Sequence, residues 1–258
     1  METIRYEKNN RVARIVLNRP QAMNAISRQM SEELCTAWED FDRDPAVDVA
    51  ILTGSGEKAF CAGADLKDYI PQFFRDSARD VRRNASRGIG GITRGLHRIY
   101  KPIIGAINGW ALAGGFELAL ACDIRIASHN AGFGSFEVRR GFHHGDGGIV
   151  RLMASVGLAR TLDIVLTGRE IPAPEALALG LVSKVVPPDE LLVHADACAQ
   201  QLLANSQAAL RSAKETILEV IGRNFDDALR LESLYGYSSG DVEDIRNRLQ
   251  EFFDKTRG

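Results

Sequence analysis

The chain has 258 residues, and its 32 lysines and arginines nearly balance 34 aspartates and glutamates, so its formal net charge is only −2. A balanced charge without a long basic block gives little support to nucleic-acid binding, so we expect no nucleic-acid partner. No apolar run approaches the roughly 20 residues that span a bilayer, and the charged first ten residues do not resemble a secretory signal, so we expect no membrane association.

Strands and helices alternate over residues 1–190. Apolar runs and period-two patterns predict strands near 12–18, 47–53, 103–107, 124–127 and 182–186. Helical periodicity predicts helices near 28–43, 66–99, 115–122 and 148–166. Only helical patterns follow in 191–258. The chain is therefore predicted to consist of an α/β core over 1–190 and a helical C-terminal region over 191–258.

A loop of small residues follows the apolar strand near 47–53. It reads Phe60-Cys61-Ala62-Gly63-Ala64-Asp65 and leads into another helical pattern. Small residues let backbone amides face a ligand without obstruction by side chains. One amide from this loop could therefore form half of a two-donor site for a negative oxygen.

The segment KPIIGAINGWALAGGFELALACD, residues 101–123, supplies a second candidate donor. Its apolar strand leads to Gly114 and Gly115, and a helical pattern follows with Glu117 in the first turn. A helix N-terminus offers unpaired N–H groups and the positive end of a dipole, and glycine lets a ligand come close. A carboxylate one turn further could serve acid–base chemistry, although acidic residues in the first turn are also common for stability alone.

Together, AFCAGADLK and the 101–123 segment resemble the crotonase superfamily, the enoyl-CoA hydratase/isomerase group. The resemblance continues in AGFGSFEVRRGFHHGDGG, residues 131–148, and in LTGREIPAPEALALGLVSKVV, residues 166–186. It implies an α/β, crotonase-like (ClpP/crotonase) spiral of ββα units that binds an acyl-CoA thioester. It also implies a homotrimer or homohexamer, in which the C-terminal region serves oligomerisation and pocket closure.

The resemblance assigns the chemistry to two glutamates. It implies that Glu117 chiefly activates water for attack at the β-carbon of an enoyl thioester and that Glu137 chiefly supplies the proton to the α-carbon. Backbone amides of Ala64 and Gly114 would form the oxyanion hole. The residues expected to line the path of CoA are Ala62, Asp65, Leu66 and Lys67. Without the resemblance, the favoured interpretation of Glu137 would be a solvated acidic residue near two arginines, Arg139 and Arg140.

The loop after Glu137 departs from the usual hydratase pattern. Phe136 replaces the common proline, and the loop reads GFHHGDGG over 141–148, with His144 where proline is common and Asp146 where a small residue is common. Asp146 could modify the reaction as a third ionisable group, or it could cap the following helix. His143 and His144 suggest a loop-packing or solvent role, because no further metal ligand is evident at a suitable spacing; we expect no metal.

The sequence therefore predicts an enoyl-CoA hydratase that adds water to a trans-2-enoyl-CoA. An enoyl-CoA isomerase, or another crotonase-type lyase or hydrolase, is the alternative, and a non-catalytic acyl-CoA- or RNA-binding member is the alternative of another class. No cofactor is expected, because coenzyme A is part of the substrate. Four scattered cysteines without a C-x-x-C pair favour reduced thiols and a cytoplasmic location.

Overall fold

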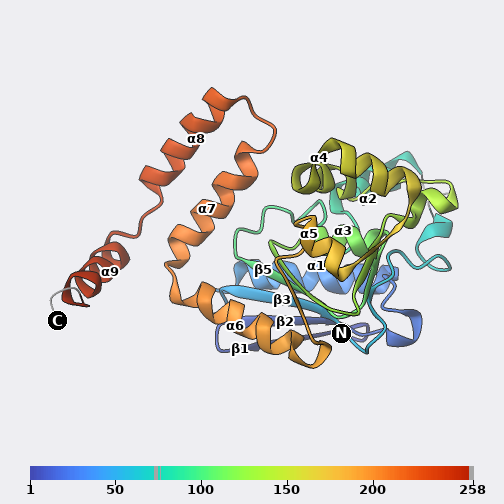
Figure 1. Cartoon of the computed structure of the whole chain (residues 1–258), viewed down its shortest axis with the longest axis horizontal. Helices are drawn as coiled ribbons and strands as arrows, with labels where there is room; N and C mark the ends of the chain where they lie inside the picture. Colours follow the sequence, from blue (N-terminus) through green and yellow to red (C-terminus); the bar gives the residue numbers. More distant parts are fainter. Residues whose placement is uncertain (73–74, 76, 256–258) are drawn as a thin grey trace.

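A computed structural model of the chain describes residues 1–72, 75 and 77–255, and its described strands form two sheets (Figure 1). The six-stranded sheet has the order β1 (Ile4–Asn9), β2 (Val12–Leu17), β3 (Val49–Gly54), β5 (Ile103–Ile107), β7 (Ile124–Ser128) and β10 (Lys184–Val186). The four-stranded sheet has the order β4 (Ala59–Cys61), β6 (Trp110–Leu112), β8 (Gly132–Gly134) and β9 (Glu170–Pro172). Pairs β1–β2 and β8–β9 are antiparallel, and the other described pairs are parallel.

Consecutive strands enter different sheets in a repeating order. The pairs β3–β4, β5–β6 and β7–β8 each place their first strand in the larger sheet and their second in the smaller one. Helices α2 (Ala78–Arg87), α3 (Gly114–Leu120) and α4 (Gly148–Thr167) follow these pairs in turn. This repetition is a spiral of ββα units, which confirms the fold that the resemblance implied.

The longer predicted elements are present, with one correction. All five expected strands occur, and the expected helix over 28–43 is α1 (Arg28–Arg43). The helix expected over 66–99 is wrong: the described part of this range holds a 3-10 turn, η2 (Ile70–Gln72), and the short helix α2, while residues 73–74 and 76 lie outside the described residues. Gly88, Gly90 and Gly91 have positive φ angles, which break the helical path after Arg87.

Two helices cover opposite faces of the larger sheet. Successive side chains of a strand point to opposite faces; Ala50 and Leu52 join the cluster that includes α1, while Val49 and Ile51 join the cluster that includes α6 (Leu191–Ala204). Ser27 caps α1 by accepting a hydrogen bond from the Met30 amide. The remaining short elements are η1 (Pro20–Ala22), η3 (Phe136–Arg140), α5 (Ala173–Ala178) and η4 (Pro188–Glu190).

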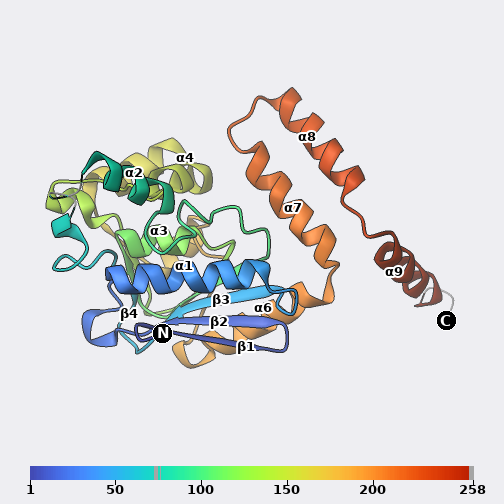
Figure 2. The same cartoon turned by 180° about the vertical axis from the view of Figure 1, so that it is seen from behind.

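The last three helices extend away from the α/β body, as both views show (Figures 1 and 2). They are α7 (Gln207–Val220), α8 (Phe225–Ser238) and α9 (Val242–Lys255). No residue of α7 or α8 is buried. In the described part of the chain, three ion pairs nevertheless tie α7 to the body: Lys214 to Asp123 at 2.7 Å, Arg211 to Asp48 at 2.5 Å and Glu219 to Arg98 at 3.2 Å. Among the described residues, no helix is long and apolar enough to cross a bilayer.

Candidate active site

The two expected oxyanion donors lie beside each other. The start of α3 packs against the loop after β4: a Cβ placed on Gly63 would lie 2.9 Å from the Gly114 nitrogen, and one placed on Gly114 would lie 3.5 Å from the Ala64 nitrogen. Within the described residues, neither the Ala64 nor the Gly114 amide donates a hydrogen bond to another backbone or side-chain group. Two adjacent, unengaged amides can both donate to one negative oxygen, and this oxyanion role stays a prediction.

Backbone packing holds this pair of amides in place. A Cβ on Gly115 would lie only 2.0 Å from the carbonyl oxygen of Cys61, so glycine alone permits α3 to approach β4 this closely. Ala113, the residue before the helix, has φ 53° and ψ −125°, which is an uncommon conformation for a residue with a side chain. The Ala113 amide is anchored by donating to the Gly134 carbonyl at 2.8 Å.

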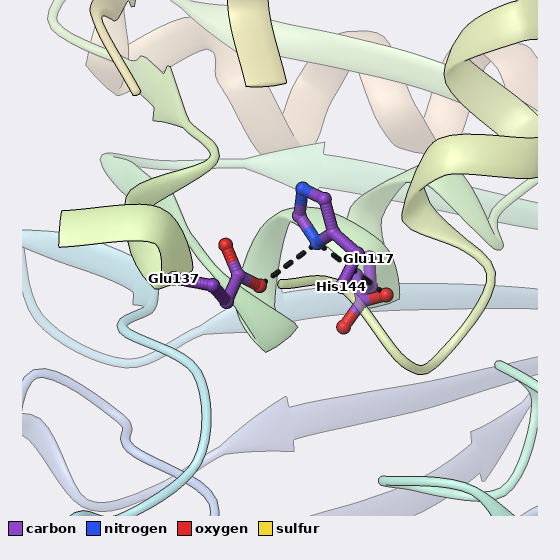
Figure 3. A group of neighbouring side chains, drawn as sticks. All are labelled: Glu117, Glu137 and His144. Carbon is purple, nitrogen blue, oxygen red and sulfur yellow. Dashed lines mark ion pairs between the residues drawn. The ribbon is translucent and has the colours of Figure 1, made fainter. Parts of the chain in front are cut away.

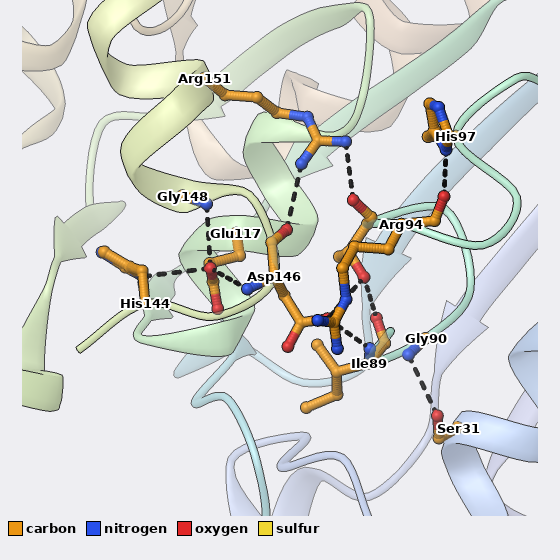
Figure 4. Close-up of polar contacts among 11 residues, drawn as sticks. Ser31, Ile89, Gly90, Arg94, His97, Glu117, His144, Asp146, Gly148 and Arg151 are labelled. Atoms are coloured by element: carbon orange, nitrogen blue, oxygen red, sulfur yellow. Dashed lines mark hydrogen bonds and ion pairs between the residues drawn. The ribbon is translucent and has the colours of Figure 1, made fainter. Parts of the chain in front are cut away.

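Glu117 is buried in the first turn of α3 and is fixed by backbone donors. Its Oε1 accepts hydrogen bonds from the amides of Asp146 at 2.7 Å and Gly148 at 2.9 Å (Figure 4). Both donors lie at the start of α4, where unpaired N–H groups favour a negative partner. These bonds orient the carboxylate and, among the described residues, leave its Oε2 without a hydrogen-bond donor.

Glu137 is buried in η3, directly after β8. The Phe136 ring that replaces the common proline folds back over Gly134, where any Cβ would lie 2.3 Å from that ring. The Arg139 guanidinium stacks over the same ring at 4.0 Å from its centroid. Phe136 and Arg139 thus stack on each other. The buried Glu137 side chain points inward, toward Glu117 (Figure 3).

His144 lies between the two glutamates. Its Nδ1 is 2.8 Å from Glu137 Oε1 and 3.4 Å from Glu117 Oε1 (Figure 3). Its Nε2 is 2.7 Å from the Ser135 hydroxyl. The side chain of His144 is only 1% exposed. Of the two expected roles, loop packing or solvent exposure, the solvent role is therefore wrong for His144. His143 is exposed, and its Nδ1 forms a hydrogen bond with the His144 carbonyl at 2.7 Å.

The charge state of His144 follows from this placement. Burial alone would lower the pKa of the imidazole, but the nearby carboxylates of Glu117 and Glu137 outweigh it and raise the pKa to about 9. The ring is therefore an imidazolium at neutral pH. Neither Glu137 oxygen has a well-directed hydrogen bond from the described residues, so the close ion pair with His144 compensates its burial.

Glu117, Glu137 and His144 are also residue types that bind divalent metals, and their ligand atoms lie within 4.8 Å of one another. The expectation that His144 has no suitable ligands nearby is thus wrong. Glu117 Oε1 already accepts two hydrogen bonds from backbone amides. These bonds favour a proton over a metal as the cation shared by the cluster.

Asp146 does not cap α4. The N-cap residue is Gly147, with no side-chain cap, and Asp146 Oδ1 instead accepts from the Ile89 amide at 2.8 Å and the Thr93 hydroxyl at 3.1 Å (Figure 4). Arg94 Nε lies 3.2 Å from the same oxygen. Burial and the charge of Glu117 raise the pKa of Asp146, against these donors. Its carboxyl group therefore holds the turn over 89–93, whose first residue approaches Gly114.

The residues expected along the CoA path lie at the edge of the site. Ala62 is half-buried, while Leu66 and Lys67 are exposed. Asp65 is engaged locally, with Oδ2 2.9 Å from Arg19 and Oδ1 accepting from the Lys67 amide at 3.0 Å. These positions leave the CoA-binding role a prediction.

Sequence reasoning missed His144 as a member of the site and its contact with Ser135. The signal was present in part, since His144 stands where proline is common in the family. Ser135 and His144 are nine residues apart, and a 3-10 turn and an irregular loop bring them together. Such a contact has no periodic signal in the sequence from which it could be predicted.

Comparisons with known proteins identify the family of this chain. A family model described as enoyl-CoA hydratase/isomerase matches residues 7–257. A probable enoyl-CoA hydratase of Mycobacterium tuberculosis is 38% identical over 98% of this chain and 96% of its own length. A crotonyl-CoA hydratase of Syntrophomonas wolfei is 40% identical over 90% of this chain and 87% of its own length. The crystal structure of an enoyl-CoA hydratase from Bacillus anthracis, 36% identical, superposes with a TM-score of 0.88 over 98% of this chain and 97% of that one. The shared ββα spiral, the paired glutamates and these matches together show that the chain belongs to the enoyl-CoA hydratase/isomerase family.

Proposed function

We propose that this chain is an enoyl-CoA hydratase, which adds water across the double bond of a trans-2-enoyl-CoA thioester. One observation carries the proposal: two buried carboxylates from α3 and η3 converge beside a pair of unengaged backbone amides. The names of the relatives in Mycobacterium tuberculosis and Syntrophomonas wolfei support the same activity.

The proposal gives a task to each group. The thioester oxygen binds the amides of Ala64 and Gly114, which stabilise the charge that develops there as the β-carbon is attacked. Glu117 holds the attacking water and takes its proton, and Glu137 delivers a proton to the α-carbon. The reaction needs no cofactor, because coenzyme A belongs to the substrate. Ala62, Asp65, Leu66 and Lys67 then line the entry of the CoA moiety.

The experiment compares Glu117→Gln and Glu137→Gln with the wild type on crotonyl-CoA, following the loss of enoyl-thioester absorbance. Each variant should lose about two orders of magnitude or more in turnover, because an amide cannot exchange the proton. Glu170→Gln, which changes an exposed glutamate of β9, is the control and should keep full activity. Full activity in either site variant would remove that glutamate from the mechanism.

Isomerisation of a 3-enoyl-CoA is a second candidate, favoured by the position of His144. Its Nδ1 contacts both carboxylates and could pass a proton from one to the other. Moving a double bond requires removal and return of a proton but no water. Products formed from crotonyl-CoA and from a 3-enoyl-CoA, separated by chromatography, decide between the two reactions. Acyl-CoA binding in calorimetry without turnover of either substrate would instead indicate a non-catalytic member.

We also propose that residues 1–190 form the acyl-CoA-binding and catalytic unit, and that residues 191–258 serve oligomerisation and pocket closure in a cytoplasmic homotrimer or homohexamer. Support comes from the large apolar side chains that α7, α8 and α9 leave exposed, among them Ile217, Leu234, Leu249, Phe252 and Phe253. Light scattering on the full chain should give a mass three or six times that of the 28.3 kDa protomer.

A further inference from the structure

The feature that the proposed hydration does not use is the imidazolium of His144. The Nε2 atom of His144 lies 2.7 Å from the Ser135 hydroxyl, directly after β8. This contact orients the ring so that the other nitrogen, Nδ1, points to the glutamates. Nδ1 then faces Glu137 Oε1 at 2.8 Å and Glu117 Oε1 at 3.4 Å. One nitrogen atom is therefore within reach of both acid–base groups of the site.

The other charged groups around the cluster are engaged elsewhere. Arg151 of α4 donates to the carbonyls of Asp146 at 3.1 Å and Thr93 at 2.9 Å. The Asp146 carboxylate faces the 89–93 turn and lies 3.2 Å from Arg94. Glu117 and Glu137 are thus the ionisable groups that His144 faces from α3 and η3, and its imidazolium is the cation in direct contact with both.

We propose that His144 is a positioning residue that relays a proton between Glu117 and Glu137. This inference rests on the proposed function and adds a third group to its proton-transfer steps. The alternative, a packed histidine, would not require one ring nitrogen to contact two buried carboxylates while the other is fixed by a hydroxyl.

The steps balance without any further reactant. Water forms the C–O bond at the β-carbon and gives its proton to Glu117, while the π-electron pair moves to the thioester as an enolate. Nδ1–H of His144 protonates the Glu137 carboxylate, which gives that proton to the α-carbon. Glu117 then returns the proton that it took from water to Nδ1. The substrate has gained H and OH, and each protein group is restored.

The test uses His144→Gln, which keeps a polar side chain of similar reach but carries no transferable proton. We expect kcat on crotonyl-CoA to fall about tenfold or more with little change in KM, as for removal of a proton-transfer group. Wild-type kcat should decline as the pH rises through about 9, where His144 loses its proton, and the variant should lack this decline. His143→Gln is the matched control and should match the wild type in both measurements, since within the described residues its ring hydrogen-bonds a backbone carbonyl and no side chain.

A second readout does not depend on hydration. The wild type should exchange the α-protons of butyryl-CoA with D2O, followed by NMR, and His144→Gln should slow this exchange about tenfold or more. Ser135→Ala, which removes the hydroxyl partner of the ring, should lower both rates by a smaller factor. Its melting temperature should equal that of the wild type, which would show that the fold is unchanged. If His144→Gln does not fold, the Ser135→Ala rates decide: a loss supports the relay and wild-type rates overturn it.

The outcomes separate the relay from the function. A folded His144→Gln enzyme with wild-type kcat and the same alkaline decline overturns the relay while leaving hydration intact. Absence of hydration in the wild type, with α-proton exchange that still depends on His144, overturns the proposed hydratase but supports the relay. Wild-type activity that a chelator removes and a divalent metal alone restores would make His144 a metal ligand and overturn the relay.

Discussion

The buried imidazolium should make the stability of this protein depend on pH in a defined direction. The ordinary pKa of histidine is about 6.5, and the pKa of His144 is raised to about 9 in the folded chain. A raised pKa stabilises the fold fully below about pH 6.5, and this stabilisation disappears as the pH rises through about 9. Each pH unit between the two values is worth about 1.4 kcal/mol, so the whole effect is roughly 3 kcal/mol.

The assay is urea unfolding of the wild type and His144→Gln at a series of pH values from 6 to 10. The wild type should lose roughly 3 kcal/mol of unfolding free energy across this range beyond any loss in the variant. For a urea slope near 3 kcal/mol/M, that difference moves the midpoint by about 1 M. Comparison of the two proteins cancels other titrations in this range, such as the buried thiols of Cys61 and Cys122, whose pKa values burial raises to about 12. Parallel pH curves for the two proteins would refute the ion pair as drawn from the structure.

Other predictions concern the backbone around the glutamates. Gly115→Ala should lower the free energy of unfolding by about 1–3 kcal/mol in urea, because its Cβ would meet the Cys61 carbonyl at 2.0 Å; Gly114→Ala, with no contact under 3.4 Å, should unfold like the wild type. Gly114→Pro should remain folded in circular dichroism, since proline suits the first helical position, yet lose turnover with its N–H, and a folded, active enzyme would contradict the donor role. Asp146→Asn should keep the rate on crotonyl-CoA and on a 3-enoyl-CoA within about threefold, because Asn can still accept from the Ile89 amide; a large loss on one substrate at an unchanged melting temperature would instead show a direct catalytic part.

Long, regular patterns made the core of the fold predictable. The β-branched run of β5 and the glycine pair before Glu117 each specify local structure over several residues, and both lie where expected. The three-residue strands β4, β6, β8 and β9 were not predicted, because so short a segment has no period to detect and is defined only by its neighbours in the sheet.

The reactive centre was predictable only in part. The resemblance placed both glutamates, and the structure brings them together. Residues 66–99 read as one helix because charged and apolar residues repeat suitably there, whereas the glycines after Arg87 turn the chain toward Asp146. The placement of His144 depends on an irregular loop, and such tertiary contacts leave no periodic trace in the sequence.

The near-absence of buried side chains in α7 and α8 has a consequence for amide hydrogen exchange. Segments with few buried contacts open at a lower free energy than the core of the same molecule. In a dilute, isolated chain, amides of these helices should therefore exchange within the time that β3 and β5 remain protected, since those strands are buried on both faces. Slow exchange in α7 and α8 at higher protein concentration would then report directly that another copy of the chain has covered them.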